Sequence, residues 1–142
     1  MEKLGQEEQD RIFNELVISG LVLALLFYDT VLENPNSNIE FFSELKIEMF
    51  SAYSSILVEL GAKKDDADLF KKVILMRLKE CQKDYEENKA ELPSKKTLAW
   101  PLIVAIGCYD HVTRGEGHPA DHAFKITAKW LSDLFLIILK IK

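Results

Sequence analysis

The stretch LVISGLVLALLFY, residues 16–28, decides the fold of this chain. Every residue in it except Ser19 and Gly20 is apolar, and Glu15 and Asp29 close it at its two ends. Thirteen helical residues extend over about 20 Å, which is short of the roughly 30 Å of a bilayer core. A helix that is apolar on most of its circumference, but too short to cross a membrane, belongs at the centre of a packed bundle. We therefore predict a central core helix over residues 6–32.

The rest of the chain predicts four further helices and no strand. Breaks at residues 34–38, 92–96 and 115–117 separate stretches in which apolar residues recur at helical spacing. The expected helices cover residues 38–61, ending at Gly61; 65–90, capped by Asp65 or Asp66; 98–112; and 118–139, beginning at His118 and Pro119. Pro101 fits the first turn of the fourth helix, or kinks that helix if it begins near Thr97.

The short connections make most neighbouring helices antiparallel. The expected fold class is all-α, a single-domain bundle of about five mostly antiparallel helices over residues 1–142. The third helix is almost wholly polar beyond Cys81. We expect that end of the helix to project past the core.

Charge is distributed unevenly along the chain. Residues 1–60 carry 3 basic and 11 acidic side chains, a net charge of −8, and the remainder carries 15 basic and 12 acidic side chains, a net charge of +3, which together give −5. Binding along a nucleic-acid backbone needs a concentrated positive surface. The distribution therefore argues against DNA and against RNA as partners.

The cysteines and the N-terminus predict a cytoplasmic protein. Cys81 and Cys108 are too few for a secreted disulfide scaffold, and we expect both to be buried and reduced. The first ten residues are acidic and lack the basic-then-apolar order of a signal peptide. We expect no membrane partner.

All three histidines, His111, His118 and His122, lie within twelve residues at the corner between the fourth and fifth helices. His118 and His122 are four residues apart, a spacing that places two side chains on one side of a helix. The candidate metal ligands are therefore His118, His122 and Glu116, and the candidate catalytic residues are Arg114, His118 and His122. The spacing matches no established zinc or iron pattern, and histidines near a helix start are commonly capping or surface residues, so a purely structural role stays open. We predict no cofactor.

The sequence RGEGH, residues 114–118, resembles the arginine–histidine motif of HEPN-domain ribonucleases. Those enzymes are small helical bundles of about this length that carry the motif near the start of the last helix and act on RNA across a dimer interface. The resemblance implies that His118 is the general acid or base and that Arg114 holds the phosphate. The spacer here has three residues, whereas the family usually has about four to six.

Other signatures of enzymes are missing from the sequence, including a glycine-rich phosphate loop and a di-iron motif. The carboxylates of Glu80, Asp84 and Glu87 have a spacing that could serve Mg²⁺, but they indicate a solvated helix surface, since no matching set occurs on a second helix. We predict a non-enzymatic protein-interaction or scaffold bundle. It self-associates through its apolar first and last helices, as a homodimer, and offers acidic surface to another protein. The alternative to the homodimer is a monomer that buries these helices within one chain. The alternative function is that of a HEPN-like ribonuclease or a metal-dependent hydrolase.

Overall fold

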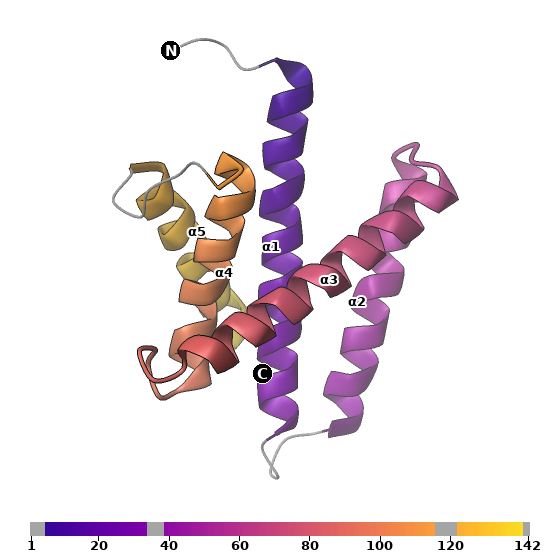
Figure 1. Cartoon of the computed structure of the whole chain (residues 1–142). Coiled ribbons are helices and arrows are strands. Elements are labelled where there is room, and N and C mark those ends of the chain that lie inside the picture. The colour runs from indigo at the N-terminus through magenta and orange to yellow at the C-terminus, as the bar shows by residue number, and fades with distance from the viewer. Residues whose placement is uncertain (1–4, 34–38, 116–121, 141–142) are drawn as a thin grey trace.

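The computed structural model describes residues 5–33, 39–115 and 122–140, which form five helices (Figure 1). No strand occurs within these three ranges, so the predicted all-α bundle is confirmed. The helices are α1 (Gln6–Leu32), α2 (Ile39–Glu59), α3 (Lys64–Asn88), α4 (Lys96–Thr113) and α5 (His122–Leu139).

The central helix of the bundle is α1, as predicted. It contacts each of the other four helices, which lie around it in Figure 1. Residues 22–28 are all buried, so two successive turns of α1 are shielded from water on every side. The run at residues 16–28 is too short to cross a membrane, but the whole of α1 is long and apolar enough by length and composition, as no other helix in the described ranges is. Half of its most apolar window is buried inside the bundle.

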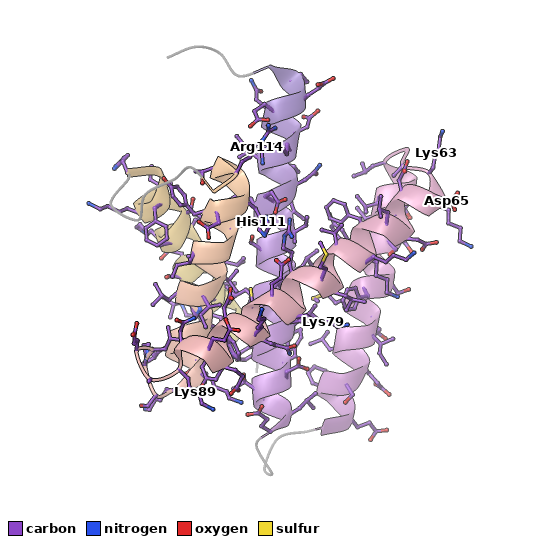
Figure 2. All side chains as sticks on the ribbon, in the orientation of Figure 1. Lys63, Asp65, Lys79, Lys89, His111 and Arg114 are labelled. Atoms are coloured by element: carbon purple, nitrogen blue, oxygen red, sulfur yellow. The ribbon has the colours of Figure 1, made fainter. Side chains whose placement is uncertain are left out.

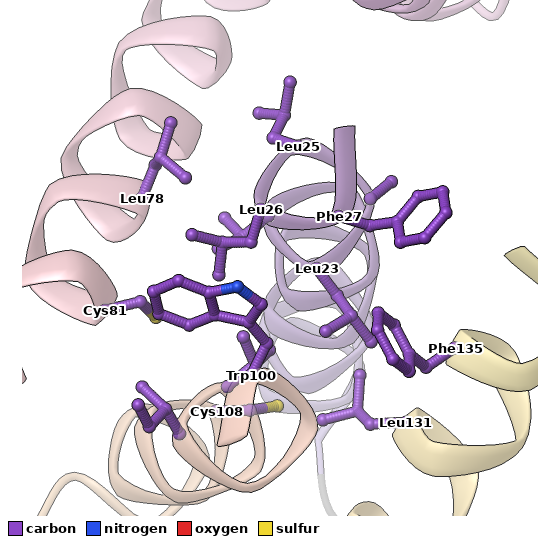
Figure 3. Close-up of a cluster of buried hydrophobic side chains, with 14 of the residues drawn as sticks. Leu23, Leu25, Leu26, Phe27, Leu78, Cys81, Trp100, Cys108, Leu131 and Phe135 are labelled. Atoms are coloured by element: carbon purple, nitrogen blue, oxygen red, sulfur yellow. The ribbon is translucent and has the colours of Figure 1, made fainter. Parts of the chain in front are cut away.

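The core is built around the C-terminal half of α1 from side chains of α3, α4 and α5 (Figure 3). Leu23 and Leu26 are fully buried on α1, and Leu131 of α5 is fully buried against the same cluster. Trp100 of α4 is also buried, and its indole nitrogen Nε1 donates a hydrogen bond to Thr30 Oγ1 at 2.9 Å. The one polar atom of this large side chain is therefore satisfied by α1 itself.

The end of α2 follows the sequence prediction. Gly61 adopts a φ of +100°, which only glycine reaches without strain. The Gly61 N–H donates to the Val58 carbonyl at 3.0 Å, and the Ala62 N–H donates to the Leu57 carbonyl at 2.9 Å. This pair of bonds is the Schellman motif, which closes the helix.

Two helix starts differ from their predictions. The residue before α3 is Lys63, which makes no side-chain capping bond, and Asp65 and Asp66 lie inside the first turn instead. There their carboxylates favour the positive end of the helix dipole. Helix α4 begins at Lys96, two residues earlier than predicted, so Pro101 lies inside the helix and removes one internal hydrogen-bond donor. The predicted start of the last helix at His118 lies outside the described residues.

The prediction that the end of α3 projects past the core is wrong. The Tyr85 ring packs against Trp100 with 4.7 Å between the ring centroids, so the end of α3 crosses α4 (Figure 1). The segment of α3 beyond Cys81 is mostly polar because only one side of it packs against the core. That one side is enough to hold the helix in place while its other residues face solvent. The opposite end of α3 and the end of α2 extend away from α1, and Leu60 and Leu69 are exposed there.

Candidate functional site

The corner between α4 and α5 is described only in part. Arg114 and His122 belong to the described residues, whereas Glu116 and His118 lie outside them. His122 is the first residue of α5 and is exposed. The convergence of Arg114, His118 and His122 stays a prediction, as does the metal set of His118, His122 and Glu116.

Arg114 has a partner within the described part of the chain. It follows the last residue of α4 in a left-handed conformation (φ 55°, ψ 36°), the only positive φ of a non-glycine residue in the described ranges. Its Nη2 donates to Glu8 Oε2 of α1 at 3.0 Å, and Figure 2 shows it beside the first turns of that helix. A phosphate would have to compete with Glu8 for this guanidinium, which does not favour a phosphate-binding role.

Arg11 joins the same end of α4 to α1. Its Nη1 donates to the His111 carbonyl at 2.8 Å, and its Nη2 donates to the Val112 carbonyl at 2.7 Å. These carbonyls belong to the last turn of α4, where the helix supplies few N–H partners; the His111 carbonyl also accepts the Arg114 N–H, at 3.4 Å. The hydrogen bond from Arg11 lowers the pKa of the Glu8 carboxyl, and the same bond raises the pKa of Arg11. The cluster thus serves as a cap for α4.

A partly open cavity of about 320 Å³ lies between α1, α3 and α4. Its floor is built from side chains that the bundle buries, namely Ser19, Val22, Cys81, Val104 and Cys108. Its rim carries the charged or titratable groups of Arg77, Glu80, Lys83, Asp84, Asp110 and His111. An apolar floor with a few polar groups around it is the usual form of a site for a small molecule.

One chain of ion pairs crosses the edge of this cavity. Arg77 Nη2 lies 3.3 Å from Glu15 Oε1 on α1, and Arg77 Nη1 lies 3.3 Å from Glu80 Oε2. The Glu80 carboxylate also lies 3.2 Å from His111 Nε2 on α4 (His111 is labelled in Figure 2). The Arg77 Nε is buried with no acceptor among the described atoms. The network fixes the relative positions of α1, α3 and α4 at the cavity.

Negative charge gathers on the other side of the rim. Burial raises the pKa of the Asp84 carboxyl, and the neighbouring carboxylates of Glu87, Glu80 and Asp110 raise it further, while Lys83 acts in the opposite direction. Asp110 extends toward this group from α4. No group of three or more His, Cys, Asp or Glu side chains that could hold a metal ion occurs within the described ranges. The described carboxylates line a cavity without forming a metal cage.

The two cysteines are free and buried, as the sequence predicts. Burial raises the pKa of the Cys81 thiol to about 12, and the carboxylates of Asp84 and Glu80 act in the same direction. Burial also raises the pKa of Cys108. Thiols with raised pKa values are poor nucleophiles at neutral pH, so the described geometry does not support cysteine catalysis here.

The Cys81 thiol is expected to make the free energy of unfolding fall as the pH becomes alkaline. Its pKa is about 12 in the folded protein against an ordinary value of 9.0, so the unfolded chain loses this proton first as the pH rises. The stabilisation is complete below about pH 9 and is lost as the pH rises toward about 12, with a loss of about 1 kcal/mol at about pH 10. Urea unfolding at about pH 8 and about pH 10 should therefore show a smaller alkaline loss in Cys81→Ala than in the wild type. Equal losses in the two proteins would contradict this reading.

Sequence reasoning singled out several residues of the cavity but did not predict that they lie together. It noted the carboxylates of Glu80 and Asp84 as a solvated surface, and it noted His111 in the histidine cluster. The structure brings these groups together because α3 crosses α4. Gly107 was not recognised as a lining residue of the cavity, although a glycine inside the apolar run of residues 102–108 is the signal that could have found it.

Comparison of the chain with protein-family models, with curated proteins and with solved structures finds no match.

Proposed function

We propose that this protein acts by association and not by catalysis, as a helical bundle that pairs with a second copy of itself and serves as an interaction or scaffold module. The observation that carries the proposal is an apolar surface that the described chain leaves open. We call it the rear apolar face, and it consists of Phe13, Ile126, Trp130 and Ile137.

The α5 part of the rear apolar face is a single stripe. Ile126, Trp130 and Ile137 are four and seven residues apart, so they lie on one side of α5. Their exposed fractions are 56%, 43% and 59%. Buried Leu131 and Phe135 occupy the other side of the helix. The stripe is therefore apolar surface beyond what the core of one chain uses.

The same face continues onto α1. An added Cβ at Gly20 would lie 3.8 Å from the Trp130 ring, so Trp130 borders α1 at Gly20. Phe13 is seven residues before Gly20, on the same side of α1, and is 65% exposed. Glu15, whose partner Arg77 is on α3, is turned away from Phe13 by roughly 200° around the helix axis. The rear apolar face thus lies on the side of α1 opposite α3.

Helix α2 lies on the other flank of α1. Within the described ranges α2 and α5 both contact α1 but do not contact each other. The side of α1 between them, around Phe13 and Gly20, is therefore covered by no other described helix, whereas residues 22–28 further along α1 are buried.

The area of this surface suits a pair of chains. If each of its four side chains leaves about 100 Å² accessible, the face offers on the order of 400 Å² of apolar surface. A standard interface buries about 800 Å² per partner, and the apolar share in homodimers is about 65%, which is on the order of 500 Å², so these four side chains would supply most of it. A second copy placed about a twofold axis would bring the same surface against itself.

The acidic surface of α2 favours association with a further partner protein. Glu40, Glu44 and Glu48 are exposed on the first half of α2. Exposed carboxylates of one sign steer association with a positively charged surface. We propose that α2 presents this acidic surface to another protein while the rear apolar face joins two copies.

The mass of the protein in solution tests the self-association. We expect light scattering to give twice the chain mass for the wild type and a mass close to one chain for Ile137→Lys, because a charge would then be buried in an apolar interface. Leu136→Lys is the matched control, since Leu136 is 55% exposed but turned by about 100° from Ile137 around α5. A wild type that stays monomeric at high concentration, or a loss of the dimer in the control alone, would contradict the proposal.

A further inference from the structure

Gly107 is the feature of the cavity that the fold itself does not require. It lies in the interior of α4, where glycine weakens a helix relative to alanine. A Cβ added at Gly107 would meet nothing within 4 Å, and its φ is not positive. Gly20 differs, because an added Cβ there would lie 3.2 Å from Leu134 Cδ2, so close packing explains that glycine. At Gly107 the absent side chain leaves the cavity open instead.

The charges at the rim select the kind of molecule that could enter. Glu80, Asp84 and Asp110 supply three carboxylates from two helices. The two permanent cations of the rim are already engaged: Arg77 is shared between Glu80 and Glu15, and Lys83 lies 3.7 Å from Glu87. The cavity therefore has an excess of negative charge, which repels anions and attracts cations.

The arrangement of the carboxylates favours an organic cation over a metal ion. Within the described ranges they form no group that could hold a metal ion, and they lie at the rim of a space of about 320 Å³. An ammonium group has several N–H donors and accepts longer and less regular arrangements of carboxylates than a metal does. The buried side chains of Val22 and Val104 offer contact to a short apolar body.

We propose that this cavity is a binding site for a small organic cation, with a primary ammonium group held between the carboxylates of Asp84 and Asp110 and a short carbon chain lying against Val22 and Val104 in the space above Gly107. Glu80 adds negative charge at the rim but is itself paired with Arg77 and His111. The proposal does not depend on self-association. The Asp84 carboxylate has those of Glu87, Glu80 and Asp110 near it, and a bound cation would offset their repulsion.

Calorimetric titration with the four-carbon diamine putrescine tests the site, with the matching four-carbon diol as the neutral control. We expect the wild type to bind putrescine with a Kd of about 1 mM or lower and to bind the diol at least about tenfold more weakly. Asp84→Asn removes one carboxylate without changing its shape, and should weaken the binding of putrescine at least about tenfold. Glu86→Gln is the charge-matched control on α3, because Glu86 pairs with Lys89 and does not line the cavity.

Gly107→Leu tests the space independently of charge. The new side chain enters open volume and replaces a poor helix former by a good one, so the protein should stay folded by circular dichroism while the binding of putrescine is lost. Gly107→Ala serves as the second variant and should keep the fold with a smaller loss of binding. The proposal is overturned if the wild type binds no putrescine at about 10 mM, if the diol or Mg²⁺ binds as tightly as putrescine, or if folded Gly107→Leu and Asp84→Asn both bind like the wild type.

Discussion

Replacing Leu26 by alanine should lower the free energy of unfolding by about 3 kcal/mol. Leu26 is fully buried on the central helix, where side chains of α3 and α4 surround it (Figure 3). Truncation removes apolar contact and leaves a cavity that neighbours on three rigid helices cannot fill, and such changes cost about 2–5 kcal/mol. Urea unfolding followed by circular dichroism measures the effect.

Leu60→Ala is the matched control for this change. Leu60 directly follows α2 and is 80% exposed, so the same substitution removes almost no buried contact. Its effect should stay within about 0.5 kcal/mol. Similar losses in the two variants would show that residue 26 is not surrounded as the structure has it.

Arg77→Met should lower the free energy of unfolding by about 2–4 kcal/mol. The side chains of Arg77 and Glu15 are 17% and 15% exposed, and the pair joins α3 to α1 at 3.3 Å. Removing the cation leaves the Glu15 carboxylate enclosed without its partner, which is far more harmful than the absence of both charges. The same urea unfolding experiment measures the loss.

Two further variants give this prediction its controls. Lys83→Met breaks a pair with Glu87 whose side chains are 73% and 59% exposed, and such a pair contributes little, so stability should hardly change. Combining Glu15→Gln with Arg77→Met should recover part of the loss, because no charge is then stranded. A double variant less stable than Arg77→Met alone would refute the argument.

The bounds of the helices follow from the sequence wherever one local signal decides them. The run at residues 16–28 and the break after it place α1, and Gly61 ends α2 through its left-handed conformation. Local signals mislead where several compete. Pro101 resembles a first-turn residue, but α4 begins at Lys96, and the turn before Pro101 carries the buried side chains of Ala99 and Trp100.

The cavity was beyond prediction because it depends on how two helices cross. Asp84 and Asp110 are twenty-six positions apart in the chain. Helical spacing predicts on which side of its own helix each residue lies, but it does not predict which other helix packs against that side. The contact of Tyr85 with Trp100 sets that crossing. Aromatic contacts between helices depend on shape, which a single sequence does not show.

Amide hydrogen exchange in the Ile137→Lys variant tests the central claim, that one chain alone keeps water from the apolar run of α1. The substitution removes self-association, so any remaining protection must come from the same chain. We expect the amides of residues 22–28 to exchange only through global unfolding, with the full unfolding free energy of the protein. Exchange of these amides as fast as that of the exposed residues at the end of α2 would contradict the account.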